Sequence, residues 1–185
     1  MARMRGKLRV AAIVIGSVAI LLLAAIIAPC LFRGRITDGG PVGARTVRML
    51  NTAQVTYSST YPDQEYAPDL ATLGPGFPAS SIDNCHATPA PACLVDSKIG
   101  CSNGTALGWC ADGVYRYNLQ TSSPAPPYKN YWITATPLKA DPENKNYCSA
   151  SDAVLRSESG PPRSLPYTLE ECLALSVDPS SYRTN

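Results

Sequence analysis

The longest apolar stretch of the chain runs from Val10 to Phe32 and contains no charged residue: VAAIVIGSVAILLLAAIIAPCLF. As a helix it would extend roughly 34 Å, which exceeds the ~30 Å hydrocarbon core of a bilayer. A buried helix of that length in a small domain would need a polar face, and this stretch has none. The pattern therefore predicts a transmembrane helix over residues 10–32.

Basic residues precede this stretch and predict its orientation. Residues 1–9 form a tip without any acid, and its cations are Arg3, Arg5, Lys7 and Arg9. Because cytoplasmic flanks are enriched in Lys and Arg, the tip is expected in the cytoplasm. The expected localisation is the inner (cytoplasmic) membrane, single-pass, with the C-terminal domain periplasmic or extracellular.

Two processing routes would remove this helix. A signal peptidase could cut after Ala28, and a lipoprotein route would acylate Cys30, but Pro29 adjoins both sites. Proline fixes φ and lacks an N–H, which hinders a peptidase that binds its substrate as an extended strand. The apolar run is also longer than the about 7–15 residues usual for a signal peptide. We therefore expect retention, with Pro29 as a helix kink and Cys30 as a buried thiol.

Residues 33–61 are predicted to form a linker and an amphipathic helix. Apolar or aromatic side chains recur there at steps of three and four, as one face of a helix requires. These positions are Val47, Leu50, Ala53 or Gln54, Tyr57 and Tyr61. Pro62 and Asp63 then end the pattern.

Alternation after this helix predicts an antiparallel sheet. Residues 62–112 are rich in Pro and Cys and are expected to form loops. Within residues 113–157, strands are expected over Gly113–Gln120 and Asn130–Leu138, with a weaker third around Cys148 and the sequence DAVLRS. Linkers rich in Pro, Asn and Asp separate them, which favours a meander packed on the amphipathic helix, an α+β arrangement.

The last segment, residues 158–185, is predicted to hold a loop, one short helix and a tail. Thr168 followed by Glu171 matches a capping box for a helix over Leu169–Ser176. The tail from Val177 is expected to be loose.

The charge distribution argues against nucleic acid as a partner. The formal net charge is +2, but four of the cations precede the apolar run. From Gly34 onward there are 11 basic and 14 acidic residues, so this part carries 11 − 14 = −3. A mildly acidic body has no basic stripe with which to neutralise phosphates.

Several stretches resemble type IV pilins and the pseudopilins of type II secretion. They are IAPCLFRGRI, RTVRMLNTAQVTYSSTYP, YAPDLATLG, ACLVDSKIG, YWITATPLKA and YCSASDAVLRS, which together span most of residues 29–157. The resemblance implies a pilin-like fold: a long N-terminal helix with a membrane-spanning first half, packed on a small antiparallel β-sheet with disulfide-stapled loops.

The opening residues depart from the pilin pattern. Pilins carry a glycine at the prepilin cleavage point and then an apolar run containing a glutamate. Here Gly6 is followed by Lys7 and Arg9, and Leu8–Ala12 contains no acid. Two cations without a carboxylate would be costly in lipid, on the order of 2.5–3.5 kcal/mol each near mid-bilayer. The usual cleavage motif and its glutamate are therefore lacking.

Six of the seven cysteines follow the apolar run and predict disulfides. An even number in an exported domain favours disulfides, although six cysteines allow 15 connectivities. We expect the pairs Cys85–Cys93, Cys101–Cys110 and Cys148–Cys172, and the last resembles the C-terminal disulfide loop of many pilins. A metal site at NCHATPAPAC is the alternative, but CxxC is absent and the spacings are far from those of structural zinc sites.

No catalytic motif is found, and neither a cofactor nor a metal is expected. His86 is the single histidine, and GxSxG, HExxH and a P-loop are missing. Asp63, Glu65 and Asp69 could bind Ca²⁺ through oxygen ligands, but solvated loop acids are the commoner reading. An aromatic concentration could be a contact surface or simply the sheet core: Tyr128, Tyr131, Trp132 and Tyr147. Asn103 starts a three-residue glycosylation pattern of little specificity.

These observations together predict a non-enzymatic, membrane-anchored pilin-like structural protein of the bacterial envelope. By resemblance it would be a minor or non-polymerising component of a type IV pilus or type II secretion apparatus, with the membrane and other pilin or secretion-system subunits as partners. Gly16 and Ser17 offer a small patch for close helix packing. The alternative is a membrane-tethered envelope binding domain unconnected with any filament.

Overall fold

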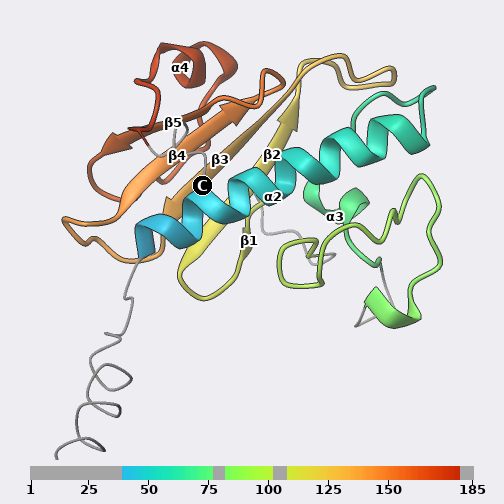
Figure 1. Cartoon of the computed structure of the whole chain (residues 1–185), viewed down its shortest axis with the longest axis horizontal. Coiled ribbons are helices and arrows are strands. Elements are labelled where there is room, and N and C mark those ends of the chain that lie inside the picture. Colours follow the sequence, from blue (N-terminus) through green and yellow to red (C-terminus); the bar gives the residue numbers. More distant parts are fainter. Residues whose placement is uncertain (1–38, 77–81, 102–107, 180–185) are drawn as a thin grey trace, which may run out of the picture. The chain divides into compact units, whose positions relative to one another are not determined.

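The computed structural model describes residues 39–76, 82–101 and 108–179 (Figure 1). These residues all belong to one compact unit, Asp38–Asn185. Several predictions fall outside them: the basic tip with Arg3, Arg5, Lys7 and Arg9, the segment 10–32 with Pro29 and Cys30, and Asn103.

Helix α2, Gly39–Thr60, is the long helix of the described chain, and the other described helices are short. The predicted pilin-like fold, with a long N-terminal helix that spans a membrane in its first half, is therefore wrong for this structure. Within the described ranges, none of the helices combines the length and the apolar character needed to cross a bilayer. That finding also contradicts the predicted single-pass localisation in the inner membrane.

Helix α2 is amphipathic, and it packs on the sheet with its apolar face. Ala44, Val47, Leu50, Ala53 and Tyr57 are all buried at its inner face. The spacing of three and four residues that predicted a helix also selects this buried face. The helix ends at Thr60, two residues before Pro62. Its other face carries Arg, Thr and Ser side chains. The helix is therefore apolar along one face only, as expected for a helix at the surface of a domain.

A five-stranded antiparallel sheet forms the centre of the described domain. Its strands follow chain order as a meander, β1-β2-β3-β4-β5. They are β1 Cys110–Ala111, β2 Tyr115–Thr121, β3 Tyr131–Pro137, β4 Lys145–Ala150 and β5 Leu155–Ser159. The weak third strand expected around Cys148 and DAVLRS is in fact the β4–β5 hairpin, with Cys148 opposite Arg156.

Both faces of the sheet are covered, so polar side chains of its strands are buried as well as apolar ones. In β3, Ile133 and Ala135 face α2 and join the main core. The alternate residue Thr134 is equally buried, but on the opposite face, where the C-terminal segment covers it. Strand β3 alternates between apolar residues and threonines, and both sets are buried. Polar residues can occupy such a strand when each one has a hydrogen-bond partner.

The loops that follow α2 are held by backbone contacts and by buried polar side chains. Gln54 of α2 forms two hydrogen bonds with the backbone of Ala67, of 3.0 and 2.8 Å. Two short helices follow, α3 Leu70–Leu73 and η1 Ile82–Asn84. Gly74 and Gly100 approach so closely that a Cβ on Gly74 would lie 2.3 Å from the Gly100 carbonyl oxygen. Glycine is therefore required there for the loop to pack against α3.

The C-terminal helix α4, Leu169–Ala174, starts with the capping box predicted from the sequence. The Thr168 hydroxyl accepts a hydrogen bond from Glu171 N–H, and the Glu171 carboxylate accepts one from Thr168 N–H. These bonds satisfy two backbone donors at the helix start. Cys172 is the buried side chain of α4 and directs the helix onto β4.

Candidate functional site

Three disulfides in the described part of the chain confirm the prediction that the cysteines form disulfide bonds. They join Cys85 to Cys93, Cys101 to Cys110 and Cys148 to Cys172, which are the pairs named from the sequence. The first two close short loops in the Pro-rich region, and the third ties α4 to β4. Such bonds persist in an oxidising environment.

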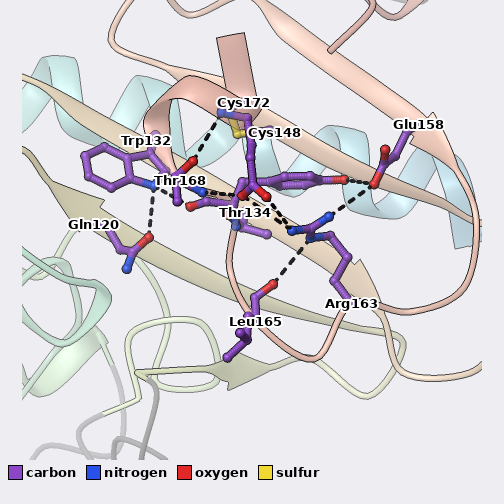
Figure 2. Close-up of polar contacts among 11 residues, drawn as sticks. Gln120, Trp132, Thr134, Cys148, Glu158, Arg163, Leu165, Thr168 and Cys172 are labelled. Atoms are coloured by element: carbon purple, nitrogen blue, oxygen red, sulfur yellow. Dashed lines mark hydrogen bonds and ion pairs between the residues drawn. A yellow bond between two sulfur atoms is a disulfide. The ribbon is translucent and has the colours of Figure 1, made fainter. Parts of the chain in front are cut away.

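The face of the sheet opposite α2 holds the backbone of the segment Pro161–Tyr167, and Figure 2 shows part of this arrangement. The Thr134 and Thr136 hydroxyls accept hydrogen bonds from the N–H groups of Tyr167 and Arg163, at 3.1 and 2.8 Å. Sheet side chains therefore bind the main chain of this segment, while the Tyr167 ring is buried against Cys148 and Cys172.

Two more sheet side chains complete this set of contacts. The Trp132 Nε1–H group donates to the Tyr167 carbonyl at 2.8 Å and to Gln120 Oε1 at 2.9 Å (Figure 2). Asn146 Nδ2 donates to the Pro161 carbonyl at 3.0 Å. Since each of these groups is partly or fully buried, an unmade bond would carry the full desolvation cost of the group.

Arg163 lies above Tyr167 between two carboxylates. Its guanidinium carbon is 4.0 Å from the Tyr167 ring centroid, within cation–π range. The ion pairs are long, 3.6 Å to Glu158 and 3.4 Å to Glu171. The Tyr167 hydroxyl donates to Glu158 Oε1 at 2.5 Å. Burial raises the pKa of Tyr167, and the hydrogen bond to Glu158 raises it further because a phenolate there would face a carboxylate.

A polar groove opens beside these residues, between the ends of β4 and β5 and the loop that follows β5. It encloses about 510 Å³. Nine residues line it: Asn146, Glu158, Ser159, Gly160, Pro161, Pro162, Arg163, Ser164 and Leu165. The Leu165 side chain is 58% exposed at its rim. The lining of the groove therefore combines opposite charges, hydroxyl groups and a small apolar surface, all of which can contact a bound molecule.

The outer face of α2 is a second candidate surface. After Arg48 the helix contains no charged residue. Met49 and Val55 expose 41% and 55% of their surface there. The hydroxyls beside them bond to the helix's own carbonyls, as with Thr52 to Arg48 at 3.1 Å and Thr56 to Thr52 at 2.9 Å. The face therefore presents methyl groups and few free donors.

The acidic residues of the loop after α2 do not converge on one point. Asp69 caps α3 by accepting a hydrogen bond from Thr72 N–H at 2.8 Å. Glu65 adopts a positive φ of 62° and forms a bridge with Tyr128. Among the residues that the structure describes, no three His, Cys, Asp or Glu side chains gather where they could hold a metal ion. His86 is exposed in its loop.

The predicted aromatic concentration is divided between the two faces of the sheet. Tyr131 and Tyr147 are buried under α2 in the main core, whereas Trp132 packs with Cys148 and Tyr167 on the other face. Tyr128 is half-buried in the loop before β3. The groove and Arg163 were missed from the sequence, although the turn-rich stretch GPPRSLPY marks the loop that forms them.

Searches with this chain against protein-family models, curated proteins and solved structures find no match.

Proposed function

We propose that this chain is a non-enzymatic, pilin-like structural protein, a minor or non-polymerising component of a type IV pilus or type II secretion apparatus. The observation that carries the proposal is the outer face of α2. A helix face that stays in water normally carries charges, whereas this one has none after Arg48 and exposes Met49 and Val55.

The hydroxyl groups on this face favour contact with protein over contact with water. Ser59 and Thr60 donate to carbonyls four residues earlier, at 2.9 and 2.8 Å, as Thr52 and Thr56 do. Their polar atoms are already satisfied when the face is covered, so covering it desolvates few unpaired groups. The inner face of α2 is meanwhile fixed on the sheet, which gives a partner a rigid surface.

The stretches similar to pilins include this helix, RTVRMLNTAQVTYSSTYP. A neighbouring subunit that presents an apolar helix would bury Met49 and Val55, at roughly 25 cal/mol per Å² of apolar area removed from water. Such a contact is individually weak, which suits a component that is repeated or transient in a larger assembly.

Site-specific photo-crosslinking in native cells tests the proposal. A photoreactive amino acid replaces Val55 in the full chain, and the matched control places it at Val114, which is 44% exposed but far from the outer face of α2 in sequence. We expect Val55 to crosslink to pilin or secretion-system subunits and Val114 to do so far less. Equal yields at both positions, or partners of Val55 that belong to no such apparatus, would contradict the proposal and favour a binding domain unconnected with any filament.

A further inference from the structure

Strand β5 is an edge strand whose cover stops part-way along it. The Ser157 N–H donates to the Ser176 carbonyl at 3.0 Å, and the Asp178 N–H donates to the Leu155 carbonyl at 2.9 Å. Residues 176–178 therefore cover the first half of β5. Before Ser176 the chain forms helix α4, which ends at Ala174, and the described residues show no backbone hydrogen bond from this helix to β5.

The uncovered half of β5 ends at Ser159, beside the groove. Because Ser157 points its N–H away from β4, Ser159 points its N–H and C=O the same way, two residues further along. Within the described residues, no backbone group hydrogen-bonds to this outward N–H or C=O. An edge with open backbone groups is a template for an added strand. Ser159 itself lines the groove, so an added strand would enter it.

Two partly exposed carboxylates flank Arg163 at the groove: Glu158 lines the groove, and Glu171 lies beside Arg163. Arg163 is shared between Glu158 and Glu171, whose side chains are 39% and 49% exposed. At 3.6 and 3.4 Å, neither pair has the ~2.7–2.9 Å length of a strong charge-assisted bond. The second cation nearby, Arg116, donates to the Arg163 carbonyl oxygen and lies over the Trp109 ring. Among the ion pairs of the described residues, Glu158 and Glu171 have only these long contacts with Arg163. Lys145, across from Ser159 in β4, is already paired with Asp178 at 3.2 Å.

We propose that this groove binds an extended segment of a partner protein, added as a strand to β5 at Ser159 and carrying a Lys or Arg flanked by apolar side chains. The backbone of the segment pairs with Ser159, and its cation meets Glu158 and Glu171. Its apolar side chains cover Leu165, Pro161 and Pro162. Main-chain bonds supply affinity in this mode of recognition, and side chains supply selectivity. The site is independent of the outer face of α2.

Titration of the full chain with two defined peptides tests the proposal. The first is acetyl-Val-Lys-Val-Arg-Val-Thr-amide, and the second has Glu and Asp in place of Lys and Arg. Amide chemical shifts report the binding site. We expect the basic peptide to bind and to shift Ser159 and the loop 160–165, and the acidic peptide to bind at least about fivefold more weakly.

Two pairs of variants locate the bonds. Ser159→Pro removes the outward N–H without touching the ladder to β4, and Ser159→Ala, its control, removes only the hydroxyl. We expect loss of binding in the first and unchanged binding in the second. Glu171→Gln keeps the capping box, since Gln also serves at that position, and should weaken the basic peptide about threefold at low salt.

Some results would overturn the proposal. These are binding that survives Ser159→Pro, equal affinity for the two peptides, or no shift at 158–165 at millimolar peptide. If Ser159→Pro fails to fold, as judged by its circular dichroism, Leu165→Ala replaces it. Leu165 is 58% exposed, so its truncation leaves the fold intact and is expected to weaken the basic peptide several-fold. Unchanged affinity in that variant would also overturn the proposal. The crosslinking experiment at Val55 tests the proposed function separately, because it does not involve this groove.

Discussion

The Thr134 hydroxyl accepts a hydrogen bond from the Tyr167 N–H at 3.1 Å, between residues 33 positions apart in the chain. Thr134 is fully buried in β3, and Tyr167 belongs to the segment that crosses the sheet on the face opposite α2. This bond and its neighbours at Thr136, Trp132 and Asn146 dock the C-terminal segment through its backbone.

Thr134→Val should therefore destabilise the domain. Valine has nearly the same shape but offers no acceptor, so the Tyr167 N–H is left buried and unpaired, at about 1–3 kcal/mol. Urea unfolding followed by circular dichroism measures the change in free energy. The matched control is Thr52→Val, whose hydroxyl bonds its own helix at an exposed position. A loss at Thr134 no greater than at Thr52 would contradict the assigned role of the bond.

The disulfide Cys148–Cys172 should contribute more to stability than Cys85–Cys93. In the chain-entropy model, the longer loop restricts the unfolded chain more: the sequence separations are 24 and 8 residues. The model gives about 3.5 and about 2.6 kcal/mol, respectively. Paired Cys→Ala variants and urea unfolding measure both losses. A greater loss for Cys85–Cys93 would show that native packing outweighs loop length here.

Gly74→Ala should be strongly destabilising. Its Cβ would lie 2.3 Å from the Gly100 carbonyl oxygen, a backbone atom that can move only if the loop moves. We expect a loss of about 1–3 kcal/mol or more in the free energy of unfolding. Gly160→Ala is the control, because the nearest atom to its Cβ is 4.0 Å away, on the side-chain amide of Asn146. Similar stability of the two variants would argue against the close approach of Gly74 and Gly100.

The buried tyrosines predict a loss of stability at alkaline pH. Burial raises the pKa of Tyr115 to about 12, against 10.0 in the unfolded chain. Burial likewise raises the pKa of Tyr57, Tyr117, Tyr131, Tyr147 and Tyr167. Between pH 10 and 12 the unfolded state therefore binds fewer protons than the folded state. Stability is complete below pH 10 and falls above it, by up to about 1.4 kcal/mol per pH unit for Tyr115.

Urea unfolding at pH 8, 9, 10 and 11, with absorbance at 295 nm to follow phenolate formation, measures this dependence. Tyr115→Phe removes one titrating group and should make the decline shallower. A wild-type stability that stays constant from pH 9 to 11 would show that these hydroxyls are accessible to solvent in the folded state.

Asp152 predicts a smaller effect at acid pH. The hydrogen bond from the Arg156 guanidinium holds the pKa of Asp152 below its usual 3.8. A lowered pKa stabilises the fold above the unfolded value, and the contribution is lost as pH falls through the folded value. Because Asp152 is 39% exposed, Asp152→Asn should cost no more than about 1 kcal/mol at pH 7. The difference from wild type should shrink below pH 4, and a difference that grows there would contradict the pairing.

Local patterns in the sequence predicted those parts of the domain that local physics determines. Apolar spacing identified the buried face of α2, from Val47 to Tyr57. Alternation placed β2 and β3 within two residues of their ends. The sequence Thr168–Glu171 was sufficient for the start of α4, because a capping box needs only four consecutive residues. The three cysteine pairs were also as named.

Other features depended on contacts that no local pattern contains. The expected fold with a membrane-spanning first half of a long helix was wrong for the described residues, where α2 starts at Gly39. The burial of Thr134, Thr136 and Asn146 was not predicted, because the segment that buries them follows at least 15 positions later. The groove lies between that segment and the ends of β4 and β5.

The amino-acid sequence by itself determined the helix face, the strands, the cap and the cysteines available for pairing, because each depends on residues a few positions apart or on composition. The tertiary structure alone decided which polar side chains are buried, where the edge of β5 is left uncovered and which charges share Arg163. These depend on the folded path of the C-terminal segment, whose backbone forms hydrogen bonds with side chains far away in the sequence.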